Sequence, residues 1–233
     1  MKVTSDLLKN FTLFHELKET ELERLASSSE LKRFARRAIV LAAGKHENRV
    51  CLLFEGRLQG VDFTIDGREV GMYFVDRGDY CGELCIFDQG AQPEHVIALN
   101  SSSVVFVPTD LLSDVATRNP IIMEKLGKKL AYRVRQLTKQ RALLALPNIP
   151  QRVCNQLWVL ARDLGAQGTN NFEIENSPTH MEIAIMLNIS RETVTRVFQQ
   201  LQKRKIVSRS GANKLTINSP EELKEIAEGI IQL

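Results

Sequence analysis

The feature that most constrains the fold is the segment from Leu31 to Val107, in which short apolar or alternating runs are separated by glycine-containing turns. Glu55-Gly56 and Arg77-Gly78-Asp79 are two such turns. Runs of this length predict β-strands, and the spaces between them are too short for ordinary helices. Residues 82–87 are the exception, where a single helical turn fits. The segment therefore predicts an antiparallel barrel or sandwich.

A long helical segment follows the strand-rich one. It starts near Pro108 and, after Asn119-Pro120, continues to about Leu146. Its apolar residues recur at intervals of three, four or seven, a spacing typical of a coiled-coil seam. Such a stripe packs either on the chain's own barrel or on a second copy of the chain. The seam residues are Met123, Leu126, Leu130, Val134, Leu137 and Leu144, with Arg141 at the skipped position.

The last third of the chain has the pattern of a winged helix-turn-helix. Prolines break the long helix, short amphipathic helices follow, and a turn between two apolar runs predicts a hairpin. The predicted elements are a hinge at Pro147-Asn148-Ile149-Pro150, a helix over 152–164, two helices joined by a turn at 187–189, a hairpin over 205–217 around Ser210-Gly211-Ala212-Asn213, and a helix from the capping box Ser219-Pro220-Glu221-Glu222 to about Ile231.

The stretch from Ser190 to Arg196 opens the second helix of this motif. An arginine matches the two acceptors of guanine, and a glutamate accepts from the amino group of cytosine. Arg191, Glu192 and Arg196 are therefore the predicted base-reading residues. A serine is a favourable N-cap, and hydroxyl groups near a helix N-terminus suit phosphate contacts. The predicted phosphate contacts are Ser190, Thr193, Thr195, His180, Arg209 and Lys214.

Charge is distributed unevenly along the chain. The formal net charge is only +3 over 233 residues, yet residues 191–214 contain seven Lys or Arg and a single acid, Glu192. Such a local field favours phosphate binding. The longest apolar runs, such as 104–107, are too short to span a bilayer, and residues 1–6 lack the apolar core of a signal peptide. We therefore expect a cytoplasmic protein without a membrane partner.

Together these patterns resemble the Crp/Fnr family of bacterial transcription regulators. The resemblance covers nearly the whole chain and includes Gly78-Asp79 followed by Gly82-Glu83-Leu84, Asn119-Pro120, and residues 190–194. It implies an α+β fold with an N-terminal antiparallel β-roll, a jelly roll of the cyclic-nucleotide-binding type. A long dimerisation helix and a C-terminal winged helix-turn-helix complete this fold. The implied domains are a sensor domain with N-terminal helices over 1–118, the dimerisation helix over 119–146 and the DNA-binding domain over 147–233.

The resemblance also implies what the chain binds. Its recognition helix is similar to that of the cyclic AMP receptor branch, in which the residues matching Arg191, Glu192 and Arg196 read a TGTGA-type half-site. A homodimer through residues 121–146 would set two such helices about one DNA turn apart, roughly 34 Å. Double-stranded DNA, a second copy of the chain and RNA polymerase are the implied partners. No catalytic motif stands out, so we do not expect an enzyme.

The effector pocket departs from the family pattern. In cyclic-nucleotide-binding members, an Arg that neutralises the phosphate follows Gly-Glu-Leu at a fixed distance, and Ser or Thr and then Ala come after it. The corresponding residues here are Pro93, Glu94 and His95. Proline cannot neutralise a phosphodiester and Glu94 would repel it, so we expect no binding of cyclic AMP at physiological concentration. The remaining candidate effector contacts are Gly82, Glu83, Leu84 and Thr138, with Glu83 alternatively paired to an Arg.

Other signals stay open. Cys81 and Cys85 flank the Gly-Glu-Leu turn and could form a redox disulfide, although a buried free cysteine is the commoner situation. Residues 1–50 contain no Cys, so we expect no iron–sulfur cluster, and no spacing of His and Met supports haem. The alternatives are control by another nucleotide-like or redox signal, a ligand-independent regulator, and a sensor module without DNA binding, which the basic C-terminal third opposes.

Overall fold

The computed structural model describes residues 2–65, 67, 69–167, 171–175, 177–211 and 214–233. The chain divides into two compact units, Met1–Arg135 and Gln136–Leu233, which meet inside one long helix, α5 (Pro120–Leu144). The sequence predicted boundaries near 118 and 146 instead. The boundary lies within α5 because Leu126 belongs to the core of the first unit and Leu143 to the core of the second.

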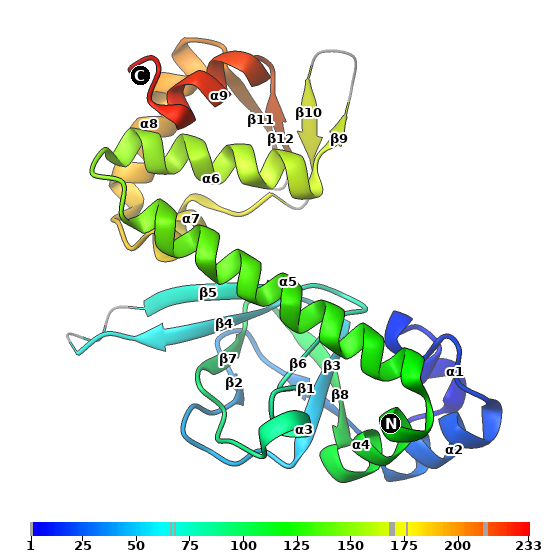
Figure 1. The fold of residues 1–233 in the computed structure, drawn as a ribbon. Coiled ribbons are helices and arrows are strands. Elements are labelled where there is room, and N and C mark those ends of the chain that lie inside the picture. The colour runs from blue at the N-terminus through cyan, green and yellow to red at the C-terminus, as the bar shows by residue number, and fades with distance from the viewer. Residues whose placement is uncertain (1, 66, 68, 168–170, 176, 212–213) are drawn as a thin grey trace. The chain divides into compact units, whose positions relative to one another are not determined.

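The first unit contains a β-roll, as predicted (Figure 1). Its described residues form two four-stranded antiparallel sheets with the strand orders β1-β8-β3-β6 and β2-β7-β4-β5. Cross-strand pairing between segments far apart in sequence closes the roll, since β1 and β3 both pair with β8. The strands are β1 (Glu30–Phe34), β2 (Ile39–Leu41), β3 (Arg49–Glu55), β4 (Leu58–Phe63), β5 (Glu69–Val75), β6 (Tyr80–Cys81), β7 (His95–Ala98) and β8 (Ser102–Pro108).

Strand β3 shows how the first unit is layered. Val50 and Leu52 belong to the apolar cluster shared with the helices, while Cys51 and Leu53 belong to the cluster between the two sheets. Side chains alternate along a strand, so a continuous apolar run indicates burial on both faces. Sheet, sheet and helices therefore form three layers. The helices of this unit are α1 (Ser5–Leu8), a 3₁₀ turn (Thr12–Phe14), α2 (Glu19–Ser28), α3 (Cys85–Asp88), α4 (Thr109–Arg118) and the first part of α5.

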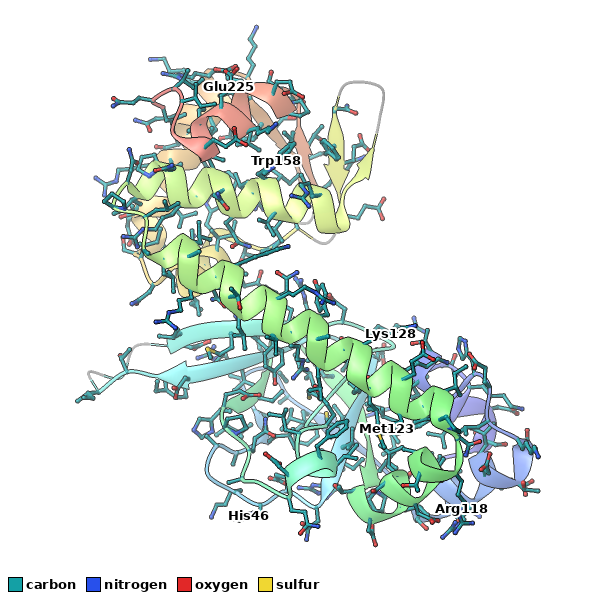
Figure 2. The ribbon with its side chains drawn as sticks, viewed as in Figure 1. His46, Arg118, Met123, Lys128, Trp158 and Glu225 are labelled. Atoms are coloured by element: carbon teal, nitrogen blue, oxygen red, sulfur yellow. The ribbon has the colours of Figure 1, made fainter. Side chains whose placement is uncertain are left out.

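Helix α5 packs on the first unit with residues from the predicted seam. Leu126 is fully buried there and Met123 packs against the same cluster, so at these positions the stripe packs on the chain's own roll, and the preferred role of Leu126 in a dimer seam is wrong. Met123 points toward the body of the unit and Lys128 away from it (Figure 2). Among the described residues no helix, α5 included, is long and apolar enough to cross a membrane. The outward-facing residues at helical spacing are Gly127, Ala131, Val134 and Thr138, with Leu137 beside them.

The second unit is a winged helix-turn-helix, as predicted. Its hairpin and its four-stranded sheet, in the order β11-β12-β10-β9, share one apolar core with the helices. The hairpin turn residues Ala212 and Asn213 lie outside the described residues. The elements are α6 (Ile149–Leu164), β9 (Ala166–Gln167), β10 (Phe172–Ile174), α7 (His180–Leu187), α8 (Arg191–Lys203), β11 (Val207–Ser210), β12 (Lys214–Ile217) and α9 (Pro220–Glu228).

One helix start and one helix cap in the second unit differ from the prediction, while α9 begins at Pro220 as predicted. Helix α6 begins at Ile149 rather than Arg152, because Asn148 caps it through the backbone N–H of Gln151. Pro150 fits in the first turn, where its missing N–H would have had no partner within the helix. At α9 the predicted capping box is wrong, since the Ser219 side chain accepts no hydrogen bond from the helix.

Candidate DNA interface and effector pocket

Local side-chain bonds hold the two helices of the motif in place. The Thr179 hydroxyl accepts from the backbone N–H of Glu182 (3.2 Å), whose carboxylate accepts from the N–H of Thr179 (2.6 Å). This reciprocal pair starts α7. Asn188 then takes a left-handed conformation (φ 51°) that ends α7. Ser190 starts α8 as predicted, with its hydroxyl accepting from the N–H of Thr193 (3.2 Å).

Helix α8 divides cleanly into a buried and an exposed side. Four apolar side chains pack into the same core as Ile183 and Leu187 of α7, as the sequence indicated. The three predicted base-reading residues, Arg191, Glu192 and Arg196, are all exposed. The exposed side of this helix therefore presents two guanidinium groups and one carboxylate, a set that matches base edges in a major groove. The buried residues are Val194, Val197, Phe198 and Leu201.

The hydroxyl of Thr193 links the start of α8 to one of its arginines. The hydroxyl oxygens of Ser190 and Thr193 are 2.9 Å apart, and Nη2 of Arg196 donates to the Thr193 oxygen (3.2 Å). These residues lie three positions apart, on one face of the helix. Thr193, a predicted phosphate contact, thus also orients the Arg196 guanidinium.

His180 and Arg209 are both drawn into the motif rather than left free at its surface. The His180 ring is 4.3 Å from that of Phe198, and its Nδ1 lies 3.1 Å from the Thr195 hydroxyl. That hydroxyl donates to the carbonyl of Arg191 (2.9 Å), so we assign the proton of this contact to His180 Nδ1. Arg209 donates to the carbonyl of Pro178 (2.6 Å). Burial, then the charges of Arg209 and Arg191, lower the pKa of His180.

Lys214, another predicted phosphate contact, lies at the start of wing strand β12. Its ammonium group is 2.7 Å from the Glu173 carboxylate on the neighbouring strand β10. Both side chains are a little under half exposed, and the hydrogen bond that Lys214 donates to the Glu173 carboxylate raises the pKa of the lysine. The lysine is therefore charged, but a carboxylate competes with any phosphate for it.

In the β-roll, the Gly-Glu-Leu turn brings Glu83 into the interior. Gly82 has a positive φ (78°), and a Cβ there would lie 3.0 Å from a Leu41 methyl group. The Glu83 side chain is 0% exposed, and its carboxylate is 3.1 Å from Nη1 of Arg133 on α5. Neither carboxylate oxygen makes a hydrogen bond with the described residues, so this ion pair provides its charge compensation. The predicted alternative, Glu83 paired to an Arg, is the arrangement present.

Glu94 lies in the same interior, 7% exposed, whereas Pro93 before it points out to solvent. The Tyr73 hydroxyl donates to Oε1 of Glu94, and the side-chain amide of Gln92 donates to the same oxygen (2.8 Å). The Arg133 guanidinium lies over the Tyr73 ring, 4.0 Å from its centre, a contact of up to about 2 kcal/mol where water is excluded. Burial raises the pKa of Glu94, and the charge of Glu83 adds to this effect.

Comparison with known proteins agrees with both parts of this description. Residues 31–119 match the family model of the cyclic nucleotide-binding domain, and residues 151–226 match that of the Crp-like helix-turn-helix domain. The chain belongs to the Crp/Fnr family. As a Crp/Fnr regulator it has a helix-turn-helix DNA-binding domain, and the curated relatives described below are transcription regulators rather than enzymes.

Relatives of this Crp/Fnr regulator match it over almost its full length. The CRP-like cAMP-activated global transcriptional regulator of Mycobacterium tuberculosis is 27% identical over 214 residues, covering 92% of this chain and 96% of its own. The Cyclic AMP receptor protein of Thermus thermophilus is 25% identical over 224 residues, covering 96% and 100%. A CooA variant from Carboxydothermus hydrogenoformans shares the fold, with a TM-score of 0.78, 17% identity and 97% coverage of both chains.

The remaining predicted contacts of this Crp/Fnr regulator lie in different places. Leu84 is half-buried and precedes the short helix α3. Thr138 is exposed on α5 and belongs to the second compact unit, whereas the turn at 82–84 belongs to the first. Sequence reasoning did not identify Tyr73, Gln92 or Arg133. Their roles depend on strand pairing and helix docking, which no local sequence motif predicts.

The cysteine pair of this Crp/Fnr regulator differs from the predicted one. Cys81 is fully buried and lies directly opposite Cys51, which is also fully buried, in the β3–β6 pairing. Cys85 instead donates to the carbonyl of Gly82 (2.9 Å). Burial raises the pKa of both Cys51 and Cys85. If a disulfide forms at Cys81, the strand register favours Cys51 as its partner.

Proposed function

We propose that this Crp/Fnr regulator is a homodimer that binds a palindromic DNA site with TGTGA-like half-sites and acts without cyclic AMP. The observation that supports it most is the exposure of Arg191, Glu192 and Arg196 together on one helix of a winged helix-turn-helix. An interaction with RNA polymerase and a cytoplasmic location remain predictions that follow from this role.

The half-site assignment rests on the chemistry of those three side chains. Arg191 and Arg196 each match the two acceptors of a guanine, and Glu192 matches the amino group of a cytosine. Selection of binding sites from a random DNA pool should enrich inverted TGTGA repeats. Enrichment of an unrelated sequence would contradict the register we assign to α8.

The dimer proposal rests on the outward side of α5. Val134 is 62% exposed and Leu137 is 46% exposed, although both are large apolar residues. Gly127 and Ala131 precede them on the same side and leave room for a second helix to approach closely. A two-fold arrangement would give each half of a palindrome its own recognition helix. Light scattering of the purified protein should give twice the mass of one chain.

Independence from cyclic AMP is supported by the side chains that surround Glu83. The interior of the β-roll beside Glu83 contains the buried carboxyl group of Glu94, and Pro93 has no cationic group to offer a phosphodiester. An added anion would face Glu83 and Glu94 together in a poorly solvated space. Isothermal titration should therefore show no binding of cyclic AMP at micromolar concentration, and gel shifts with an inverted TGTGA repeat should not require it. Micromolar binding would overturn this part of the proposal.

A further inference from the structure

The N-terminal half of α5 is held on the β-roll by two cations. Lys129 donates to the carbonyl of Tyr80 (2.6 Å), forms an ion pair with Asp79, and lies over the Tyr80 ring. Arg133, one turn later, donates to the same carbonyl (3.3 Å). Both residues are on the side of the helix opposite to Ala131 and Val134. Docking by these cations therefore turns the exposed apolar side of α5 outward.

Arg133 is fixed from two directions. Its guanidinium lies between the buried Glu83 carboxylate at 3.1 Å and the face of the Tyr73 ring at 4.0 Å. The ring is placed by its hydroxyl, which donates to Glu94. It also needs the absence of a side chain at Gly60, where a Cβ would lie 2.6 Å from the ring carbons. Glu94 thus acts on α5 through Tyr73.

The charges in this cluster leave no place for another anion. Three carboxyl groups, on Asp79, Glu83 and Glu94, face two cations, on Lys129 and Arg133. Each cation already has a carboxylate partner within ion-pair distance. A ligand phosphate would add negative charge without a free cation to meet it, whereas the Glu94 carboxyl is already bonded by Tyr73 and Gln92.

We propose that the Glu94 side chain takes the place of an effector in the interior of the β-roll. Through Tyr73 and Arg133 it holds α5 on the β-roll without any bound ligand. Glu94, Tyr73 and Gly60 are then positioning residues for the helix. This inference extends the proposed independence from cyclic AMP. Its expected effect on DNA binding rests on that proposed function. The docking itself stands on the contacts alone.

The test is hydrogen exchange of the full-length protein, followed by mass spectrometry over residues 127–135. Glu94→Ala leaves two buried donors without a partner, and Gly60→Ala displaces the Tyr73 ring. Each should accelerate exchange over this segment by about tenfold or more, since local opening becomes easier when a buried hydrogen bond is lost. Glu94→Gln keeps an acceptor oxygen for Tyr73 and should stay within about twofold of wild type.

Two further variants make the result decisive. Tyr73→Phe removes only the hydroxyl, so it should raise exchange over 127–135 even where Glu94→Ala fails to fold. Glu124→Gln breaks an exposed ion pair with Lys128 on the same helix and should change nothing. Wild-type exchange in both Glu94→Ala and Tyr73→Phe would overturn the docking proposal.

The same preparations separate the docking proposal from the proposed function. Wild-type protein that needs added cyclic AMP to bind an inverted TGTGA repeat would contradict the proposed function, whatever its exchange pattern. Faster exchange in Glu94→Ala together with weaker binding to that repeat, at unchanged base preference, would support both. Faster exchange with unchanged binding would keep the docking and refute its link to DNA recognition.

Discussion

The ammonium group of Lys214 lies 2.7 Å from the carboxylate of Glu173, so the wing of the DNA-binding unit holds a lysine whose charge is already matched. Glu173→Gln should release this lysine for a phosphate. We expect tighter binding to DNA of any sequence. The slope of log K against log salt concentration should also steepen by the amount that corresponds to about one more phosphate contact. Fluorescence anisotropy over a salt series measures both.

A matched control for this prediction lies on α9. Glu228 is an exposed carboxylate 4.0 Å from Lys224, and Glu228→Gln changes the net charge by the same amount. An equal gain in affinity from both variants would mean that overall charge, rather than the wing, is responsible.

Arg191→Ala should weaken binding to the preferred site by about 1–3 kcal/mol and relax the preference at one base position. The arginine is exposed, so its removal should leave the stability of the second unit nearly unchanged. Binding measured against a set of single-base variants tests this. If the affinity for every sequence fell by the same factor, Arg191 would contact a phosphate instead of a base.

Thr193→Val should affect the base read by Arg196 more than the overall affinity. The variant removes the oxygen to which the Arg196 guanidinium donates, but keeps the shape of the side chain. A less ordered arginine discriminates less well between bases, so we expect a loss of preference at one position. Ser190→Thr keeps both the cap and a hydroxyl beside residue 193 and serves as the control. A uniform loss across all sequences would indicate that Thr193 holds only a phosphate.

The stability of the second unit should fall in mild acid because of His180. Its pKa is lowered in the folded state by burial and by Arg209 and Arg191, so folding favours the neutral ring. The contribution is complete above the ordinary pKa of 6.5 and is lost as the pH falls through the lower folded value. Trp158 is the single tryptophan and lies in this unit, so its fluorescence reports the unfolding selectively (Figure 2). His180→Gln should reduce the pH dependence of the melting temperature, whereas His15→Gln in the other unit should not.

Val134→Glu should convert the protein to a monomer. A carboxylate in the exposed apolar stripe of α5 would lose its water in a helix pair, at a cost of several kcal/mol. Lys139→Glu adds a carboxylate on another side of the same helix and should leave the mass unchanged. Light scattering distinguishes the two, and a dimeric Val134→Glu variant would refute this stripe as the interface.

Alkylation should separate the four cysteines by exposure. Cys85 is half-buried and lines a surface cavity of about 730 Å³, so it should react first with iodoacetamide. Cys51 and Cys81 are fully buried, and burial raises the pKa of Cys154 to about 12, so few thiolates form there. Peptide mass spectrometry should find these three labelled only after unfolding. Labelling of Cys81 before Cys85 in the native protein would contradict the structure.

Local pattern was enough to predict most elements of the fold. Short apolar or alternating runs between glycine-containing turns predicted the strands of the roll, and the cap at Ser190 predicted the start of α8, because both depend on neighbours in sequence. The errors arose where two signals compete. Pro150 looked like a helix breaker, but Asn148 caps α6 two residues earlier. Ser219 was predicted to cap α9, but its side chain accepts no hydrogen bond from the helix.

The effector pocket was less predictable than the DNA interface. Arg191, Glu192 and Arg196 follow one another on a single helix, so helical geometry alone places them together. The contacts of Glu94 join β5, the segment before β7, and α5, whose proximity depends on the whole roll. The sequence showed that a phosphate-binding Arg was missing. It could not show that Tyr73 and Arg133 come together beside Glu83 and Glu94 in the interior.

Burial of strand β3 on both of its faces has a consequence for how such a sensor can change. Residues 50–53 touch either the helices or the opposite sheet, so a polar substitution at any of them would damage one core or the other. Residues that contact an effector can therefore vary more easily outside this strand, at exposed positions such as Pro93 before β7, where a substitution disturbs neither core. The two apolar clusters can stay the same while the residues that contact an effector change, or while a side chain of the protein takes the place of the effector.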